Sequence, residues 1–378
     1  MNSLLNELQI VPSRALDAYL SANVPPEGPI RLTGYPVVTG YPQWLIEAAE
    51  DAVRRPSLAP PAGIIALRHA VARYVSRQIG QDLSHDNVLI TAGAMQAIAI
   101  TWLVLTDEGD RVVVPAPNYF VDGSLSLVGR GACHVPVPGN VFLTEALDQH
   151  LSEHPDRRHS VIYHSNPNNP TGRVMRQSDW DAILELAARH EIPYVVFDES
   201  YASMVWDGSL DLKTTIDHDP TTFVRIGSFS KAFAMPWLRC GWLVADAGII
   251  ADAEKVAGWL NLNGTSVVQS IALAALDGDH AWLNQGRDLI LRNRNRVVEG
   301  LQQIGSVVVS APDAGPFVYP RIRSQSSSQL ASQATALGIP LVPGPAFGDI
   351  DEYVRLPFVG DSNSVARALD GMKELLHD

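Results

Sequence analysis

The chain contains very little cysteine. Only Cys133 and Cys240 occur among its 378 residues. Two cysteines cannot build the disulfide framework of a small secreted domain, and here they form no short-spaced group of metal ligands. We therefore expect no metal centre and a reducing compartment, for which the cytoplasm is the default.

Runs of basic residues and long apolar runs are also missing. Charged residues make up 18% of the chain and the net charge is −13, so nucleic acid is not an expected partner. No segment is apolar for long enough to cross a bilayer, and polar residues interrupt the first 20 positions. We expect neither a membrane span nor a signal peptide.

The chain does contain ample material for a large core, with 46% apolar residues and a mean hydropathy of +0.03. Between residues 87 and 245, short β-branched runs alternate with helical patterns, which is typical of an α/β domain with a mostly parallel sheet. The expected strands are Val88–Ile90, Val112–Val114, Val161–Tyr163, Tyr194–Phe197, Phe223–Ile226 and Trp242–Val244.

Helical patterns lie between and after these strands. Ser178 is a candidate N-cap, with Asp181 three residues on, for a helix that packs on the sheet. A longer pattern over residues 280–304 is long enough to link two domains.

The C-terminal part reads as a smaller α+β domain. It has strand-like pieces at 306–309 and 317–319 and an amphipathic helix that includes Val365 and Leu376. We interpret the Ser-rich stretch 324–328 as a solvated loop.

Polar motifs follow the expected strands, at the sheet edge where open α/β sheets bind ligands. The turn Thr91–Gln96 contains Gly93 and opens a helix, so its backbone N–H groups could hold a phosphate, although taken alone such a glycine marks an ordinary turn in most proteins. In Asn166–Gly172, prolines restrict the preceding asparagines, and Asn169 could donate to a ligand oxygen or belong to a surface turn.

Two further motifs carry charge. Asp198 closes the strand Tyr194–Phe197, and a buried carboxylate there needs a charged or hydrogen-bonding partner. Lys231 ends the motif Ser228–Lys231 after the next strand, with Arg239 eight residues on. A lysine at a sheet edge is costly to desolvate unless it is neutralised or covalently engaged.

In this order the motifs resemble the class I/II aminotransferases, which are fold-type-I pyridoxal-phosphate-dependent enzymes of the aspartate aminotransferase superfamily. The resemblance extends from Ile30–Gly34 to Leu341–Gly348 and Tyr353–Leu356. It implies a large cofactor-binding domain over residues 45–280 and a small domain from residues 1–44 and 281–378.

The same resemblance implies roles for individual residues. Lys231 would hold pyridoxal 5'-phosphate in a Schiff base and shuttle a proton, Asp198 would pair with the pyridine nitrogen, and Tyr201 and Asn169 would contact the ring phenolate oxygen. Tyr119 would stack on the ring. The phosphate would be held by Gly93, Ala94, Met95, Ser228, Ser230 and Arg239.

For the substrate, the resemblance implies that Arg355 grips the α-carboxylate, aided by Gly34 and Asn169. The implied reaction is a ping-pong transfer of an amino group between an L-amino acid and a 2-oxo acid, in a homodimer with the active site at its interface. A neutral or aromatic substrate is slightly favoured over a dicarboxylic one. The candidates for a second carboxylate-binding arginine are Arg31, Arg321 and Arg323, and we interpret each of them as an ordinary surface charge.

Other outcomes stay open, since the same fold hosts elimination or replacement lyases, decarboxylating enzymes and oxygen-dependent oxidases. Trp237 stands where many relatives have glycine, which affects the loop before Arg239. Leu58 or a neighbour replaces a tyrosine that reaches the other subunit's phosphate, so we expect that contact to be missing. His134, His164 and Cys240 are expected to be structural.

Overall fold

The computed structural model describes residues 30–33, 40–137, 142–155, 157–206 and 223–376. At its centre is a seven-stranded sheet in the order β1-β7-β6-β5-β4-β2-β3. All six expected strands are present. The bounds are β1 Val88–Thr91, β2 Arg111–Ala116, β3 Gly131–Pro136, β4 His159–Ser165, β5 Tyr194–Asp198, β6 Phe223–Ser228 and β7 Gly241–Val244.

Strand direction determines where the motifs meet. β2, β3, β4, β5 and β6 pair in parallel, whereas β7 is antiparallel to both β6 and β1. β1 therefore runs in the common direction and β7 alone is reversed. As a result, the carboxyl ends of β1, β2, β4, β5 and β6 lie at one edge of the sheet, and the expected motifs follow those ends.

Helices cover both faces of this sheet, so its strands are apolar on both sides. Val112 and Val114 belong to an apolar core with α5 and α10, whereas Val113 belongs to a core with α7 and α8 on the other face. The helices of this part are α3 Gln43–Arg54, α4 Ile65–Ile79, α5 Ala94–Leu105, α6 Asp122–Leu127, α7 Leu143–Glu153, α8 Gln177–Arg189, α9 Phe229–Ala232, α10 Ala247–Asn261 and α11 Ser266–Asp277, with short 3-10 turns at His85–Asn87, Ala202–Met204 and Pro236–Leu238.

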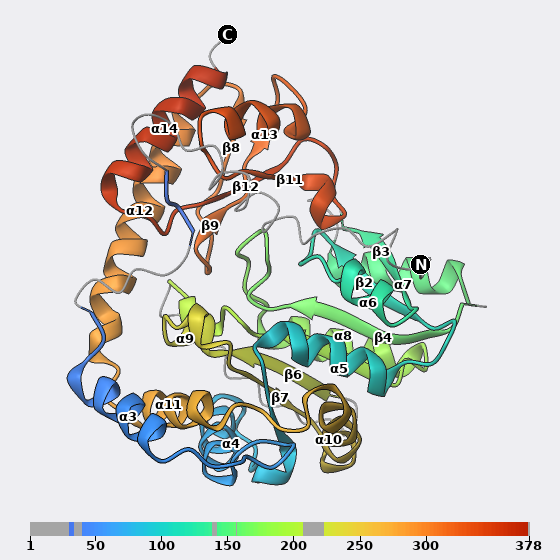
Figure 1. Cartoon of the computed structure of the whole chain (residues 1–378). Coiled ribbons are helices and arrows are strands. Elements are labelled where there is room, and N and C mark those ends of the chain that lie inside the picture. Colours follow the sequence, from blue (N-terminus) through green and yellow to red (C-terminus); the bar gives the residue numbers. More distant parts are fainter. Residues whose placement is uncertain (1–29, 34–39, 138–141, 156, 207–222, 377–378) are drawn as a thin grey trace, which may run out of the picture.

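The C-terminal part has a core of its own, which also includes Ile30, Leu32 and Met204. Figure 1 shows α12 running from the sheet-bearing body to this second body, as expected of a linking helix. Its elements are η5 Ala281–Leu283, α12 Asn284–Gln302, β8 Val307–Val308, β9 Phe317–Val318, β10 Arg321–Ile322, α13 Ser327–Ala336, β11 Val342–Pro343, η6 Gly344–Phe347, β12 Val354–Pro357 and α14 Ser362–Leu376. The domain boundaries given above remain a prediction.

Two local expectations were wrong. The helix α8 begins at Gln177 rather than after Ser178, because the Asp179 carboxylate accepts a hydrogen bond from the Arg176 N–H at 2.8 Å. The Ser-rich stretch is not a solvated loop: Ser326 caps α13, and Ser327 is fully buried and hydrogen-bonded to Asp351.

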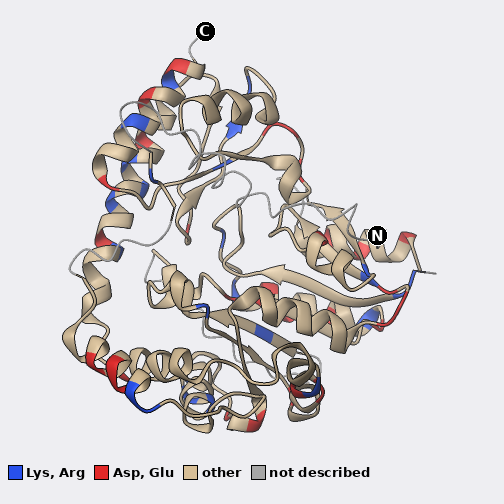
Figure 2. Ribbon diagram, in the orientation of Figure 1, with Lys and Arg blue, Asp and Glu red and all other residues tan. Residues whose placement is uncertain are grey.

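Each of the two long helices of the second body carries charges of both signs. Figure 2 shows acidic and basic residues interspersed along α12 and α14. Among the described residues, no helix is both long enough and apolar enough to span a membrane.

Candidate active site

Lys231 lies in α9, the short helix that follows β6. Ser228 begins this helix by accepting a hydrogen bond from the Ser230 N–H at 3.1 Å, and the Phe229 N–H donates to the Cys240 carbonyl at 3.1 Å. The Lys231 Nζ lies 5.9 Å from the centre of the Tyr201 ring. The turn therefore places the lysine amine beside the end of β5.

Asp198 is the last residue of β5 and is 6% exposed. One carboxylate oxygen accepts from the Ser200 N–H at 2.9 Å, and the other accepts from the Tyr163 hydroxyl at 3.2 Å. Burial raises the pKa of Asp198 above its usual value, although these donors oppose the shift. A positively charged partner at this position would reverse the effect of burial on the carboxylate.

Asn169 and Arg355 come together from opposite bodies of the molecule. Asn169 is buried after β4, and its Oδ1 accepts from the Arg355 Nη1 at 3.0 Å. This contact directs the Asn169 amide NH₂ elsewhere, as a donor. The Arg355 guanidinium, on β12, also lies 5.1 Å from the Phe347 ring centre and 5.4 Å from that of Phe317. The arginine is therefore held by an amide and by two aromatic rings.

Gly93 and Arg239 approach each other closely at the other end of the cluster. Gly93 has φ +80° and precedes α5, whose first residues are Ala94 and Met95. A Cβ on Gly93 would lie 2.7 Å from Arg239 Nη2, so a side chain here would displace the guanidinium. The helix N-terminus and the arginine together form a positively charged group of the kind that binds phosphate.

Ser230 adds a hydroxyl to this positively charged group. Its Oγ accepts from Arg239 Nη1 at 3.3 Å, and the same nitrogen donates to the Pro236 carbonyl at 3.0 Å. Arg239 adopts a left-handed conformation with φ 51° directly after the turn Pro236–Leu238. Trp237 does not disrupt this turn: its indole N–H donates to the Tyr41 hydroxyl at 2.6 Å.

Two aromatic residues border the cluster. The Tyr119 hydroxyl donates to the Met95 sulfur at 3.3 Å, which ties the end of β2 to the first turn of α5. Tyr201 packs edge-on against Phe317, with ring centres 5.2 Å apart, and burial raises its pKa to about 12. Gly34 lies outside the described residues, and Leu58 is exposed.

Sequence reasoning missed Asn118, which organises the strand ends. Its Oδ1 accepts from the Tyr119 N–H at 2.8 Å and from the Ser165 hydroxyl at 2.7 Å, while its Nδ2 lies 3.1 Å from His164 Nδ1. Ser165 in turn accepts from the Asn169 N–H at 3.0 Å. The Pro117–Asn118 turn before Tyr119 was the available signal. His164 is buried and belongs to this hydrogen-bond network.

His164 gives the protein a specific acid sensitivity. Burial lowers its pKa from 6.5 to about 4. The folded state thus binds fewer protons than the unfolded state. The contribution of neutral His164 to the free energy of unfolding is present above pH 6.5 and is lost as the pH falls toward 4; it amounts to about 3 kcal/mol. We expect urea unfolding of cofactor-free His164→Gln to show a shallower loss between pH 7 and 5 than wild type. His69→Gln, at an exposed position, should keep the wild-type slope, and identical slopes in all three proteins would contradict the assignment.

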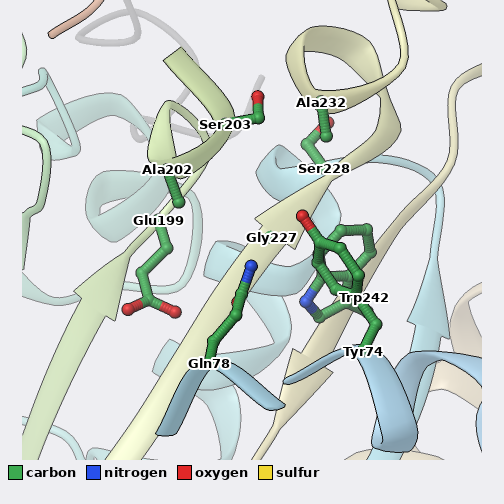
Figure 3. A pocket seen from close by; sticks show the side chains of 9 residues that line it. All are labelled: Tyr74, Gln78, Glu199, Ala202, Ser203, Gly227, Ser228, Ala232 and Trp242. Atoms are coloured by element: carbon green, nitrogen blue, oxygen red, sulfur yellow. The ribbon is translucent and has the colours of Figure 1, made fainter. Parts of the chain in front are cut away.

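A small polar hollow lies at the ends of β5 and β6, lined by Tyr74, Gln78, Glu199 and Ser203 among others (Figure 3). Glu199 forms a buried ion pair with Arg225, at 2.9 Å between Oε1 and Nη1. Gly227 is required beside Trp242, because a Cβ there would lie 2.2 Å from the indole ring. The ion pair of Glu199 with Arg225 thus joins the end of β5 to β6.

Comparison with solved structures identifies the fold. The aspartate aminotransferase of Thermus thermophilus superposes with a TM-score of 0.89 over 100% of this chain and 99% of that chain, at 23% sequence identity. The chain thus has the α/β fold of the aspartate aminotransferases, with a mostly parallel sheet flanked by helices.

Sequence comparison identifies the family. Residues 40–372 match the family described as aminotransferase class I and II, and the chain belongs to that family of enzymes. It is 28% identical to an aspartate aminotransferase of Pyrococcus horikoshii, over 84% of this chain and 82% of that protein. It is also 28% identical to an aromatic-amino-acid aminotransferase of Thermococcus litoralis, over 89% of each.

Proposed function

We propose that this aminotransferase uses pyridoxal 5'-phosphate to move an amino group between an L-amino acid and a 2-oxo acid by a ping-pong mechanism. The observation that carries the proposal is the convergence of Lys231, the buried Asp198 and the Arg355–Asn169 pair at one sheet edge. A primary amine, a buried anion and a carboxylate-binding guanidinium are the groups that this chemistry requires.

The residues present fit this cofactor. Arg239, Ser230 and the N-terminus of α5 form an anion cradle that a Cβ on Gly93 would fill. Asp198 is a buried carboxylate whose charged form a pyridinium nitrogen would stabilise. When bound, the cofactor supplies an electron sink for the bonds at the substrate's Cα.

The chain's own residues would each have a separate role in binding the cofactor and in the reaction. Lys231 would hold the cofactor covalently and act as the base for the proton on Cα. Asn169 and Tyr201 would donate to the phenolate oxygen, and Tyr119 would cover the ring. Gly93, Ala94, Met95, Ser228, Ser230 and Arg239 would bind the phosphate.

Arg355 is assigned to the substrate α-carboxylate, with Asn169 and Gly34 beside it. Its planar fork matches a carboxylate in a way that lysine cannot. We expect Arg355→Lys to raise the KM for the amino acid by roughly 10- to 100-fold, since a hydrogen bond to a charged group contributes about 1.5–3 kcal/mol.

Arg321→Lys is the matched control, because Arg321 is paired with Glu352 at 2.6 Å on the surface. It should keep the wild-type KM in steady-state assays. Equal effects of the two substitutions on KM would contradict the assignment of Arg355 to the substrate carboxylate.

We further propose a neutral or aromatic amino acid as substrate. The exposed Arg321–Glu352 ion pair supports the view that Arg321 is a surface charge. A panel of amino acids in single half-reactions tests both substrate and reaction. Stoichiometric formation of pyridoxamine phosphate supports transamination, whereas turnover without an acceptor, or with oxygen consumption, would instead indicate a lyase or an oxidase.

A cytoplasmic homodimer with the active site at its interface remains part of the proposal.

A further inference from the structure

Three potential metal ligands meet on one face of the sheet, away from the cluster just described. They are Cys133 in β3, His150 in α7 and His159, the first residue of β4. One ligand atom from each lies within 4.8 Å of the others, and Cys133 Sγ is 3.1 Å from His150 Nε2. Sulfur and imidazole nitrogen are the donors that zinc prefers.

The group is partly buried and incompletely satisfied in its hydrogen bonds. Cys133 is 7% exposed, and His159 Nε2 is buried without a hydrogen-bond partner in the described part of the chain. A buried ring nitrogen without a partner costs free energy, so a native structure that retains one calls for a specific explanation. A bound cation would use this nitrogen.

We propose that Cys133, His150 and His159 bind one zinc-type divalent ion, with water in the fourth position of a tetrahedral site. The thiol gives up its proton on binding, and both rings bind in their neutral form. A thiolate with two imidazoles selects zinc or cobalt over the oxygen-binding cations magnesium and calcium.

Charged side chains of both signs surround this site. Arg157 Nη1 donates a hydrogen bond to Cys133 Sγ at 3.5 Å. Burial lowers the pKa of His150, His154 and Arg157 lower it further, and Glu153 opposes the shift. Burial also lowers the pKa of His159 to about 4, and the neighbouring histidines and arginines, Arg111 among them, add to that shift. Both shifts favour the neutral form of the ring, the form in which imidazole binds a metal ion.

Neighbouring contacts also orient the rings. His154 stacks on His150 with ring centres 4.4 Å apart, and the His150 carbonyl lies 2.9 Å from His154 Nδ1. His150 and His159 meet edge-on at 6.0 Å. The preorganised rings reduce the entropy that metal binding must overcome.

The position of the site indicates a structural role. His159 lies at the amino end of β4, whereas the active-site residues follow the carboxyl ends of the strands. β3 is one of the two edge strands of the sheet. An ion here would tie that edge to β4 and to α7, and so would stabilise the fold without touching the chemistry.

The test uses the cofactor-loaded enzyme, freed of metal with a chelator and then titrated with Zn²⁺ or Co²⁺ alone. We expect one ion per chain by elemental analysis, a rise in Tm, and for Co²⁺ the near-ultraviolet absorption of a thiolate ligand. Cys133→Ser and His159→Asn should each weaken Zn²⁺ binding by at least about tenfold, since even second-shell changes at zinc sites cost that much. Transaminase activity at saturating cofactor should change little.

His69→Asn is the matched control, because exposed His69 forms an imidazole pair with His85, with ring centres 4.5 Å apart, that could take up metal at the surface. It should leave zinc affinity unchanged. Absence of stoichiometric binding, or weakening by His69→Asn alone, would overturn the proposal. If a cluster variant fails to fold, the wild-type Co²⁺ spectrum still decides: a spectrum without the thiolate band excludes Cys133 as a ligand.

Discussion

Lys231→Ala is expected to abolish both covalent attachment of the cofactor and turnover. The α9 turn places this amine beside Tyr201 and the end of β5, where Asp198 is buried. Loss of a positioned general base alone reduces a rate by roughly 10²–10⁴-fold, and loss of covalent attachment adds to this. Single-turnover reactions with an amino acid should therefore show no measurable formation of pyridoxamine phosphate.

Borohydride reduction followed by mass analysis of peptides supplies the second readout. Wild type should carry the reduced cofactor on Lys231, and the alanine variant should carry none. Lys255→Ala is the control, because Lys255 is exposed on α10 in an ion pair with Asp252 and should leave both readouts unchanged. A reducible adduct that persists in Lys231→Ala would refute the assignment.

Much of this arrangement could be predicted from the sequence because the motifs follow strand ends. A parallel sheet brings its carboxyl ends to one edge, so Gly93, Asn169, Asp198 and Lys231 had to come near each other once the strands were recognised. The resemblance to a family added roles that spacing alone does not give. The roles themselves remain predictions until the substitutions are made.

Other features depend on contacts between residues distant in the chain. The Asn169–Arg355 hydrogen bond joins positions 186 apart, and Asn118 contacts His164 and Ser165 from the turn that follows β2. β3 was missed because Gly131–Pro136 mixes small and polar residues, and its pairing with β2 alone makes it a strand. Pairing partners cannot be read from local propensity.

The proposed metal cluster shows the same limit more sharply. The sequence led us to expect no metal centre, because the ligands lie on three separate elements rather than in a short motif. Cys133 and His159 lie on two strands that both pair with β2, and α7 supplies the third ligand. Only the folded sheet brings these three side chains together.

Asp198→Asn is expected to have opposite effects on the cofactor-free and the cofactor-loaded protein. In the cofactor-free protein, burial raises the pKa of Asp198, so the stability that it contributes is present at low pH and is lost as pH rises through the folded-state pKa. A neutral asparagine avoids this loss. We expect the cofactor-free variant to be at least as stable as wild type at pH 7, as measured by urea unfolding.

In the loaded enzyme the same substitution should reduce turnover by roughly 10²–10⁴-fold, because removing one partner of a buried charge pair costs about 3–5 kcal/mol. Tyr163→Phe separates charge from hydrogen bonding, since it removes only the donor at 3.2 Å from the carboxylate. A hydrogen bond to a charged group contributes about 1.5–3 kcal/mol, so this variant should lose roughly 10- to 100-fold, less than Asp198→Asn loses. Equal losses in the two variants would mean that donor geometry, rather than the negative charge of Asp198, governs the site.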